Sequence, residues 1–447
     1  MAWTSPTLAA ARSLVRCAIL PTLLLASAPA AAAPGAPAEL RASLAAQAGG
    51  ELKTFYAYHS GPLWVTGRGT LDPAARELLR LIETARDDGL DPQALGARPL
   101  AEAIERAEAE RSPAALARAE LALSGALTRY ARALLSPPGP SEMLYEHDVL
   151  RPVERTPLTI LQAAADAPSL GEYLETMPWM HPLYAQVRRD LLAGQYAPPV
   201  RQAAIATLQR IRAIPAPPWS RHVVIDTASA RLWMYEGDRP VDSMKVVVGK
   251  PERPTPMMAG YIRDAVINPY WNVPEHLVRQ TIAPGVLSQG VAYLRARGYD
   301  VLSDWSDNPE RLDPARIDWR AVRDGRVEVR VRQRPGAANA MGQVKYEFPN
   351  AQGIYLHDTP DKNLLEEEAR QFSNGCVRLE DAERLGRWLL GTDLPKTATS
   401  PEQHLDLAQP VPIYITYLTV RPEGDRLVAG ADPYGWDASG RALARAH

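Results

Sequence analysis

Cys376 and His357 stand out in the sequence as two residues that together could carry out acyl transfer. Both lie in the polar segment from residue 356 to residue 381, LHDTPDKNLLEEEARQFSNGCVRLED. Free cysteine is usually buried and inert, so a thiol in so polar a segment is unusual. Attack on an acyl carbon needs a nucleophile, a nearby base and hydrogen-bond donors for the developing oxyanion. Cys376 offers the nucleophile, and His357, which ends the predicted strand GIYLH, is the candidate base.

Two features of the flanking sequence favour a reactive thiol. A free thiol has a pKa of about 8.5, so its thiolate needs stabilisation at neutral pH. The apolar pattern of residues 379–391 predicts a helix that begins just after Arg378 and directs its positive end at the sulfur. Gly375 lets the backbone approach closely, which makes the N–H groups of Gly375 and Cys376 candidates for an oxyanion hole. The alternative is that Cys376 is a buried residue leading into the helix and that His357 only ends a strand.

The N-terminal segment predicts export. Arg12 and Arg16 precede an apolar run from Cys17 to Leu25 and a stretch of small residues, which is the pattern of a secretory signal peptide over residues 1–33. A permanent N-terminal anchor is the alternative. No other stretch of the sequence reaches the ~18 apolar residues that a membrane-spanning helix needs. We therefore expect an exported protein that is soluble or tethered at its start.

Cysteine usage and charge narrow the function classes. The chain has 2 cysteines, and because Cys17 lies in the predicted signal peptide, Cys376 is the single cysteine expected in the mature protein. Exported proteins usually pair their cysteines, so a lone thiol is either a buried accident or a nucleophile. Lys and Arg number 50 against 52 Asp and Glu, without a basic cluster, which makes nucleic acid a poor candidate partner. The sequence also lacks HExxH, CxxC, GxSxG and Walker-type motifs, so it predicts no metal site, serine elbow or nucleotide site.

The chain divides at PAPPWS, residues 215–220, where the apolar pattern changes its period. Helical periodicity predicts an all-α domain over residues 34–217. In one of its helices, Asp72 and Pro73 provide the start signals and Gly89 the stop.

Period-two patterns predict a mainly β domain over residues 218–425, which makes the fold class α+β. Three strands joined by turns are expected between Arg221 and Lys250. A mixed, partly helical insertion, the size of a lid, is expected at about residues 274–325. Residues 426–447 are assigned to a C-terminal tail.

Several motifs carry a resemblance to a known family. YLHDTP at residues 355–360 and SNGCVR at residues 373–378 resemble the signature of the YkuD-type L,D-transpeptidases. The segments VVVGKPERPTP, INPYWNVP, RQRPGAANAMGQVKYEFPN and RLEDAERLGRWLL are similar, in the same order, to the larger periplasmic branch of that family. The helical half is similar to the scaffold domain of this branch. The resemblance covers roughly residues 50–435 and implies a periplasmic enzyme.

The resemblance also implies a mechanism. Cys376 would be the nucleophile and His357 the general base and later acid, with the backbone carbonyl of Asp358 orienting the imidazole and the N–H groups of Gly375 and Cys376 holding the oxyanion. The thiolate would attack the bond between meso-diaminopimelate and the terminal D-Ala of a tetrapeptide stem. The side-chain amine of a second diaminopimelate would then resolve the thioester to a 3-3 cross-link. No metal or organic cofactor is implied, and carbapenems would acylate the thiol.

The chain departs from the family pattern in two places. Asn374 stands where a histidine is more common, so any dependence on a second imidazole is in doubt. The path from Tyr184 to Arg221 is also too short for a peptidoglycan-binding module. Substrate anchoring must then come from the scaffold, the lid or a partner protein.

Several further residues are candidate substrate contacts with an alternative role. Arg378 has the geometry to pair with a substrate carboxylate, but it is equally suited to bond a neighbouring helix or loop. Trp271 and Tyr270 either line a donor groove or pack in a core. Ser373 is expected to brace the turn by hydrogen bonds.

Two rival functions stay open. The same fold can act hydrolytically, as an L,D-carboxypeptidase or in cleaving a protein from peptidoglycan, when water replaces the amine. An idle cell-wall binding or scaffolding protein is the other rival, and Asn374 keeps it open. The expected partners are peptidoglycan tetrapeptide stems, as donor and acceptor, and other cell-wall synthesis proteins.

Overall fold

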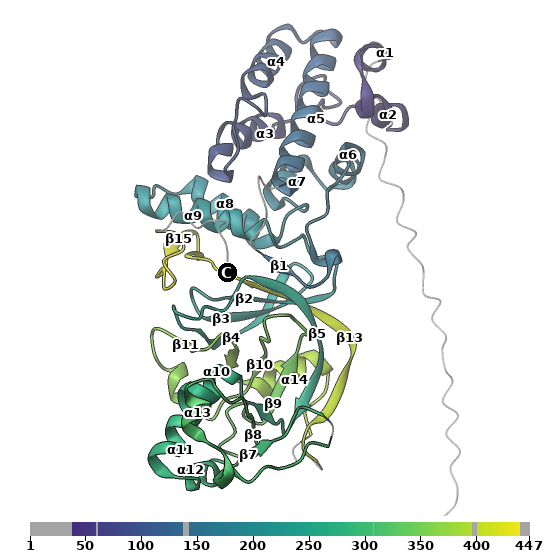
Figure 1. The fold of residues 1–447 in the computed structure, drawn as a ribbon. Helices are drawn as coiled ribbons and strands as arrows, with labels where there is room; N and C mark the ends of the chain where they lie inside the picture. Colours follow the sequence, from purple (N-terminus) through teal and green to yellow (C-terminus); the bar gives the residue numbers. More distant parts are fainter. Residues whose placement is uncertain (1–37, 60, 137–142, 307, 396–399, 439–447) are drawn as a thin grey trace, which may run out of the picture.

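The computed structural model describes most of the chain, namely residues 38–59, 61–136, 143–306, 308–395 and 400–438. The predicted signal peptide lies outside these residues. A helical region and a β-rich region lie end to end, and the chain returns near its C-terminus to the junction between them (Figure 1). This arrangement confirms the α+β class. Within the described residues, the structure contains no helix that is both long and apolar enough to cross a membrane.

The helical region is built from short amphipathic helices. They are α1 (Ala38–Gln47), α2 (Gly50–Tyr58), α3 (Ala74–Glu83), α4 (Ala97–Glu110), α5 (Pro113–Leu135), α6 (Pro157–Asp166), α7 (Leu170–Thr176), α8 (Pro182–Ala193) and α9 (Pro198–Ile211), with the 3₁₀ turns η1 (Ala85–Asp88) and η2 (Asp148–Leu150). Local sequence explains several of the starts: the side chains of Ser112, Thr156 and Ser169 each accept a hydrogen bond from the backbone N–H three residues later. Such caps satisfy N–H groups that the first helical turn leaves without partners.

One large sheet is the main element of the β-rich region. Its strands are β1 (Leu144–Tyr145), β2 (Arg221–Asp226), β3 (Arg231–Glu236), β4 (Arg239–Gly249), β5 (Met258–Ile267), β9 (Val344–Glu347), β10 (Leu356–His357), β11 (Gln371–Ser373), β12 (Val377–Leu379) and β13 (Gln403–Thr416). The three strands predicted between Arg221 and Lys250 are therefore confirmed as β2, β3 and β4.

This sheet closes on itself around one core. The strand order is β1-β5-β13-β2-β3-β4-β12-β10-β9, and β9 also pairs with β5, while β11 runs beside β4. Buried residues such as Val246, Met258 and Leu356 fill the enclosed space. Helix α14 (Ala382–Leu390) adds Leu385 and Leu389 to the same core. Closure through the β5–β9 pairing leaves few strand edges unpaired.

The expected insertion forms a small subdomain with its own core. It contains β6 (Trp271–Asn272), α10 (Glu275–Leu277), the π-helical turn η3 (Val278–Ile282), α11 (Ala283–Gln289), α12 (Ala292–Ala296), β7 (Tyr299–Leu302), η4 (Pro314–Arg316), α13 (Trp319–Arg323) and β8 (Arg330–Gln333). The three strands pair in the order β6-β8-β7, and residues such as Ile282, Leu294 and Val331 pack together beneath them.

The end of the described chain returns to the helical region. Strands β14 (Val420–Glu423) and β15 (Arg426–Ala429) form an antiparallel hairpin. Val420 and Leu427 are buried in the core of the helical region, and the hairpin lies against α8 and α9 (Figure 1). The boundary predicted at residue 425 falls between the two strands of this hairpin, so the tail contributes to the scaffold core.

Candidate active site

Sheet register brings the two predicted catalytic segments together. Strands β10 and β12 run parallel as neighbours, with Leu356 opposite Val377 and His357 opposite Arg378. Leu356 and Val377 point into the enclosed core. Because side chains alternate along a strand, His357 and Arg378 face the other side of the sheet. Cys376 directly precedes Val377, so the same alternation places its side chain on the side of His357.

His357 is held as a neutral base. Its imidazole is buried, and its Nδ1 lies 2.5 Å from the backbone carbonyl oxygen of Asp358. A carbonyl only accepts hydrogen bonds, so Nδ1 carries the proton and Nε2 keeps its lone pair. Burial lowers the pKa of His357 to about 4, and the positive charge of Arg378 acts in the same direction. At neutral pH the imidazole is therefore in the form that can take a proton.

The carboxylate of Asp358 ties this histidine to neighbouring segments. Its Oδ2 accepts from the backbone N–H of Gln343 at 2.9 Å, and its Oδ1 accepts from Lys362 Nζ at 2.8 Å. Gly342 has a φ of +63°, and a Cβ built there would lie 2.3 Å from Asp358 Oδ2, so a glycine is needed beside this carboxylate.

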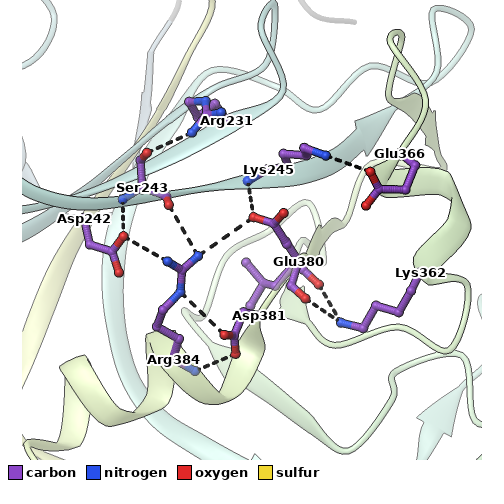
Figure 2. A network of polar contacts seen from close by, with 10 residues as sticks. Arg231, Asp242, Ser243, Lys245, Lys362, Glu366, Glu380, Asp381 and Arg384 are labelled. Carbon is purple, nitrogen blue, oxygen red and sulfur yellow. Dashed lines mark hydrogen bonds and ion pairs between the residues drawn. The ribbon is translucent and has the colours of Figure 1, made fainter.

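Lys362 extends the bracing to the strand after the nucleophile. Its Nζ also donates to the carbonyl oxygens of Leu379 and Glu380, at 3.1 and 2.8 Å. Figure 2 shows that Glu380 in turn accepts from the Lys245 backbone N–H of β4. The Lys362 side chain thus connects the segment that carries His357 to the strand that follows Cys376.

Arg384, in the first turn of α14, is the centre of the same network (Figure 2). Its guanidinium forms ion pairs with Asp242, Glu380 and Asp381 at 3.1, 3.8 and 3.5 Å. Single pairs as exposed as these contribute little to stability. Their joint effect is to fix where α14 begins relative to β4.

The thiol of Cys376 is partly buried and protonated at rest. Its Sγ lies 3.8 Å from the carbonyl oxygen of Gly353. Burial raises the pKa of Cys376, although the backbone N–H of Tyr355 and the charge of Arg378 act in the opposite direction. Nucleophilic attack by this thiol would need a base to remove its proton, and a neutral His357 is in the form that can accept one.

The helix that the sequence predicts to begin just after Arg378 begins later in the structure. Helix α14 begins at Ala382 with Asp381 as its N-cap, and strand β12 lies between the helix and the thiol. The Asp381 side chain accepts from the Arg384 backbone N–H at 2.9 Å, so the first turn is capped by an acidic residue of its own chain. The helix thus begins at Ala382 rather than just after Arg378, and the orientation of its positive end toward Cys376 stays a prediction.

The turn before Cys376 is braced by Ser373, as expected. The buried Ser373 Oγ accepts from the Gly375 N–H at 3.1 Å and donates to the Cys376 carbonyl oxygen at 2.6 Å. Gly375 has a φ of +122°, a conformation that favours glycine, and a Cβ built there would lie 3.0 Å from Ile354 Cδ1. The Gly375 N–H would have to leave Ser373 before it bound an oxyanion.

Arg378 and Asn374 differ in their surroundings. Arg378 forms an ion pair with Asp361 at 3.2 Å, which is the loop contact considered in the sequence analysis. Asn374 is exposed beside the thiol. A contact of either residue with substrate stays a prediction.

Trp271 and Tyr270 make packing contacts within the insertion. The Arg332 guanidinium lies 4.0 Å from the centre of the Tyr270 ring. The Trp271 ring lies 6.4 Å from that of Tyr299. A groove-lining role for this pair likewise stays a prediction.

Sequence reasoning did not single out Thr255, which contacts the turn at residues 373–376 (the nucleophile turn), or His276. Thr255 is buried and donates through Oγ1 to the Gly375 carbonyl oxygen at 2.7 Å. His276 of α10 has a pKa lowered by burial and by the charges of Arg253 and Lys250. Thr255 lies inside the segment VVVGKPERPTP, and its position in a polar loop after a strand was the available signal. Among the described residues, no group of three His, Cys, Asp or Glu side chains is placed to hold a metal ion.

Comparison with known proteins finds matches to both halves of the chain. The family model of the YkuD L,D-transpeptidase catalytic domain matches residues 220–413, and a scaffold-domain model matches residues 50–191. A putative L,D-transpeptidase of Haemophilus influenzae is 29% identical over 288 residues, which cover 62% of this chain and 57% of that protein. The chain thus matches little more than half the length of this relative.

Solved structures of L,D-transpeptidases also match, at a low level. An L,D-transpeptidase from Mycobacterium smegmatis is 11% identical with a TM-score of 0.22, over 44% of this chain and 58% of that chain. L,D-transpeptidase 3 from Mycobacterium tuberculosis, in complex with a faropenem-derived adduct, is 13% identical with a TM-score of 0.21, over 44% and 60% of the two chains. TM-scores this low carry no argument, and the assignment rests on the family models and the curated relative. The family models thus identify a YkuD L,D-transpeptidase catalytic domain at residues 220–413, which follows a scaffold domain at residues 50–191.

Proposed function

We propose that this protein is an L,D-transpeptidase that forms 3-3 cross-links between peptidoglycan stem peptides through a thioester on Cys376. The observation that carries the proposal is the state of His357. It is buried, neutral and hydrogen-bonded through Nδ1 to the Asp358 carbonyl, on the strand beside the one that follows Cys376. A structural histidine at a strand end needs none of these features.

The proposed reaction has two halves. His357 Nε2 takes the proton of Cys376 Sγ, and the thiolate attacks the carbonyl carbon between meso-diaminopimelate and the terminal D-Ala. Collapse of the tetrahedral intermediate forms the thioester, and the imidazolium returns its proton to the departing amine of D-Ala. A second diaminopimelate amine then attacks the thioester and gives a proton to His357, which passes it to the departing sulfur. The Cys376 N–H is the proposed donor to the oxyanion in both halves.

The experiment that tests the proposal is intact mass spectrometry after brief exposure to a carbapenem. We expect an adduct on the wild-type protein and none on Cys376→Ala. Absence of an adduct on folded wild-type protein would support the idle scaffold instead.

Tetrapeptide substrates separate the two enzymatic functions. We expect release of D-Ala together with a 3-3 linked dimer when an acceptor stem is present. Release of D-Ala with only a shortened tripeptide would identify an L,D-carboxypeptidase.

We also propose a periplasmic location for the exported chain, with peptidoglycan stems and cell-wall synthesis proteins as partners. The N-terminal segment and the proposed substrate support this location. Membrane and periplasmic fractions of cells that make the tagged full-length chain test it.

A further inference from the structure

Tyr434, near the end of the described chain, contacts β4, the strand that lies beside the start of the nucleophile turn. Its hydroxyl donates to the carbonyl oxygen of Gly249 at 2.6 Å. Gly249 is the last residue of β4, and it pairs with Ser373 of β11. A residue from the tail, which the sequence left without a role, therefore lies next to the strand that leads into Cys376.

Thr255 continues this contact to the turn itself. Its Oγ1 accepts from the Gly249 N–H at 2.8 Å and donates to the Gly375 carbonyl oxygen at 2.7 Å. The site is tightly packed, because a Cβ built on Gly249 would lie 2.3 Å from the Arg253 carbonyl oxygen. Three hydrogen bonds thus connect the Tyr434 hydroxyl to the residue before the nucleophile.

The hydrogen bond from Thr255 to the Gly375 carbonyl oxygen affects the direction of the Cys376 N–H group. The Gly375 carbonyl and the Cys376 N–H belong to one planar peptide unit, so the direction of the carbonyl fixes the direction of the N–H. Gly375, with a φ of +122°, has no side chain to restrict that plane. The Thr255 hydroxyl therefore aims the N–H that we assign to the oxyanion.

Helix α9 of the scaffold domain is connected to Tyr434 through Tyr417. The Tyr434 N–H donates to the Tyr417 hydroxyl at 3.1 Å, and the two rings stack with centroids 5.3 Å apart. Arg210 of α9, which is buried, donates to the Tyr417 carbonyl oxygen at 3.2 Å and pairs with Asp437 at 2.7 Å. The Arg210 guanidinium also lies 5.0 Å from the centre of the Tyr417 ring.

We infer that Tyr434 is a positioning residue through which the scaffold domain orients the Cys376 N–H for oxyanion binding. This inference rests on the proposed function. Tyr434 contacts neither the thiol nor the imidazole, and its effect passes through Gly249 and Thr255. The scaffold domain thereby contributes to catalysis, in addition to any contribution to peptidoglycan binding.

Tyr434→Phe tests the inference, because it removes only the hydroxyl. Two rates are measured on the full chain: acylation by a carbapenem, which needs an oxyanion donor, and alkylation of Cys376 by iodoacetamide, which needs only the thiolate. We expect acylation to slow about tenfold, less than the about 10²-fold that follows loss of a whole oxyanion donor. Alkylation should keep its wild-type rate and pH profile. Equal acylation of variant and wild type, or an equal loss of both rates, would overturn the inference.

Tyr145→Phe is the matched control. Tyr145 also donates its hydroxyl to a backbone carbonyl, that of Ala213, at 2.6 Å. We expect this variant to keep both rates, and a tenfold loss of acylation would count against a specific role for Tyr434.

Thr255→Val provides the second link in the test. It should slow acylation more than Tyr434→Phe, and the double variant should be no slower than Thr255→Val alone. Additive losses would overturn the connection through Thr255. Failure of the proposed function has a different signature, namely wild-type protein that is alkylated at Cys376 but never acylated.

Discussion

The scaffold core and the catalytic site both bury ionisable side chains, but they treat them in opposite ways. In the scaffold, Asp88 pairs with Arg188 at 2.7 Å and accepts from the Tyr130 and Tyr184 hydroxyls at 2.9 and 2.6 Å, all fully buried. In the catalytic site, His357 has one hydrogen bond to a carbonyl and one nitrogen left with its lone pair.

The difference separates a structural site from a chemical one. A buried charge needs partners for its hydrogen-bonding groups, and once it has them it is fixed in one protonation state. A buried neutral base can still accept a proton. Its pKa is lowered because burial removes the water that would solvate the protonated, charged form. Glu120 of the scaffold is intermediate. It accepts hydrogen bonds from the Tyr56 hydroxyl and the Trp64 N–H, yet burial raises its pKa to about 7.

His357→Ala should give the largest effect on the chemical side of this comparison. Removal of the general base is expected to slow acylation by about 10²–10⁴-fold. Carbapenem acylation followed by stopped-flow absorbance measures the rate, and circular dichroism checks that the fold is retained. A variant that acylated at the wild-type rate would contradict the assignment of the base.

Arg188→Met should give the largest effect on the structural side. It leaves the Asp88 charge buried without its cation, which is expected to lower the free energy of unfolding by about 3–5 kcal/mol. Urea unfolding measures the change. The matched variant Arg189→Met removes a half-exposed arginine at the next position and should cost less than about 1 kcal/mol. Similar losses in the two variants would show that the buried pair has no special role.

Glu120 makes stability depend on pH. Its pKa is about 7 in the folded protein against 4.5 for an ordinary glutamate, so the folded state binds the proton more tightly. The stability contribution is therefore fully present below pH 4.5 and is lost as pH rises toward 7, by about 3 kcal/mol from the linkage relation.

Urea unfolding at several values between pH 4.5 and 7.5 tests this dependence. Glu120→Gln removes the titrating group, so the difference in slope between wild type and variant isolates its contribution. A slope that is equal in the two proteins would contradict the raised pKa.

Substitution of Arg378 should have the smallest effect, which is a shift of the low-pH side (the acid limb) of the pH profile of acylation. His357 is a base only when neutral, so acylation in the wild type should persist well below pH 6.5 and fall as pH drops through about 4. Arg378→Gln removes a charge that lowers this pKa, so the limb should move to higher pH. The saturating rate of carbapenem acylation between pH 3.5 and 7 measures the limb. A displacement to lower pH would contradict the electrostatic role of Arg378.

The sequence points to Cys376 and His357 as the candidate pair and to a division of the chain because both have local signals. The polar setting of Cys376 and the change of apolar period at residues 215–220 are visible without contacts. The predicted start of α14 was wrong because Leu379 continues the apolar pattern of the helix. The backbone of Leu379 instead pairs with Val246 of β4, and sheet hydrogen bonds between distant segments override a short local pattern.

The sequence by itself determined the chemistry that this protein has available: one thiol and one histidine, in segments that match the YkuD L,D-transpeptidases. Only the tertiary structure decided how that chemistry is set up. Burial lowers the His357 pKa, and the Asp358 carbonyl selects the tautomer. Thr255 and Tyr434 reach the nucleophile turn from positions 120 residues before Gly375 and 185 residues after Gly249. Such contacts depend on desolvation and on closure of long loops, which residue type and spacing do not encode.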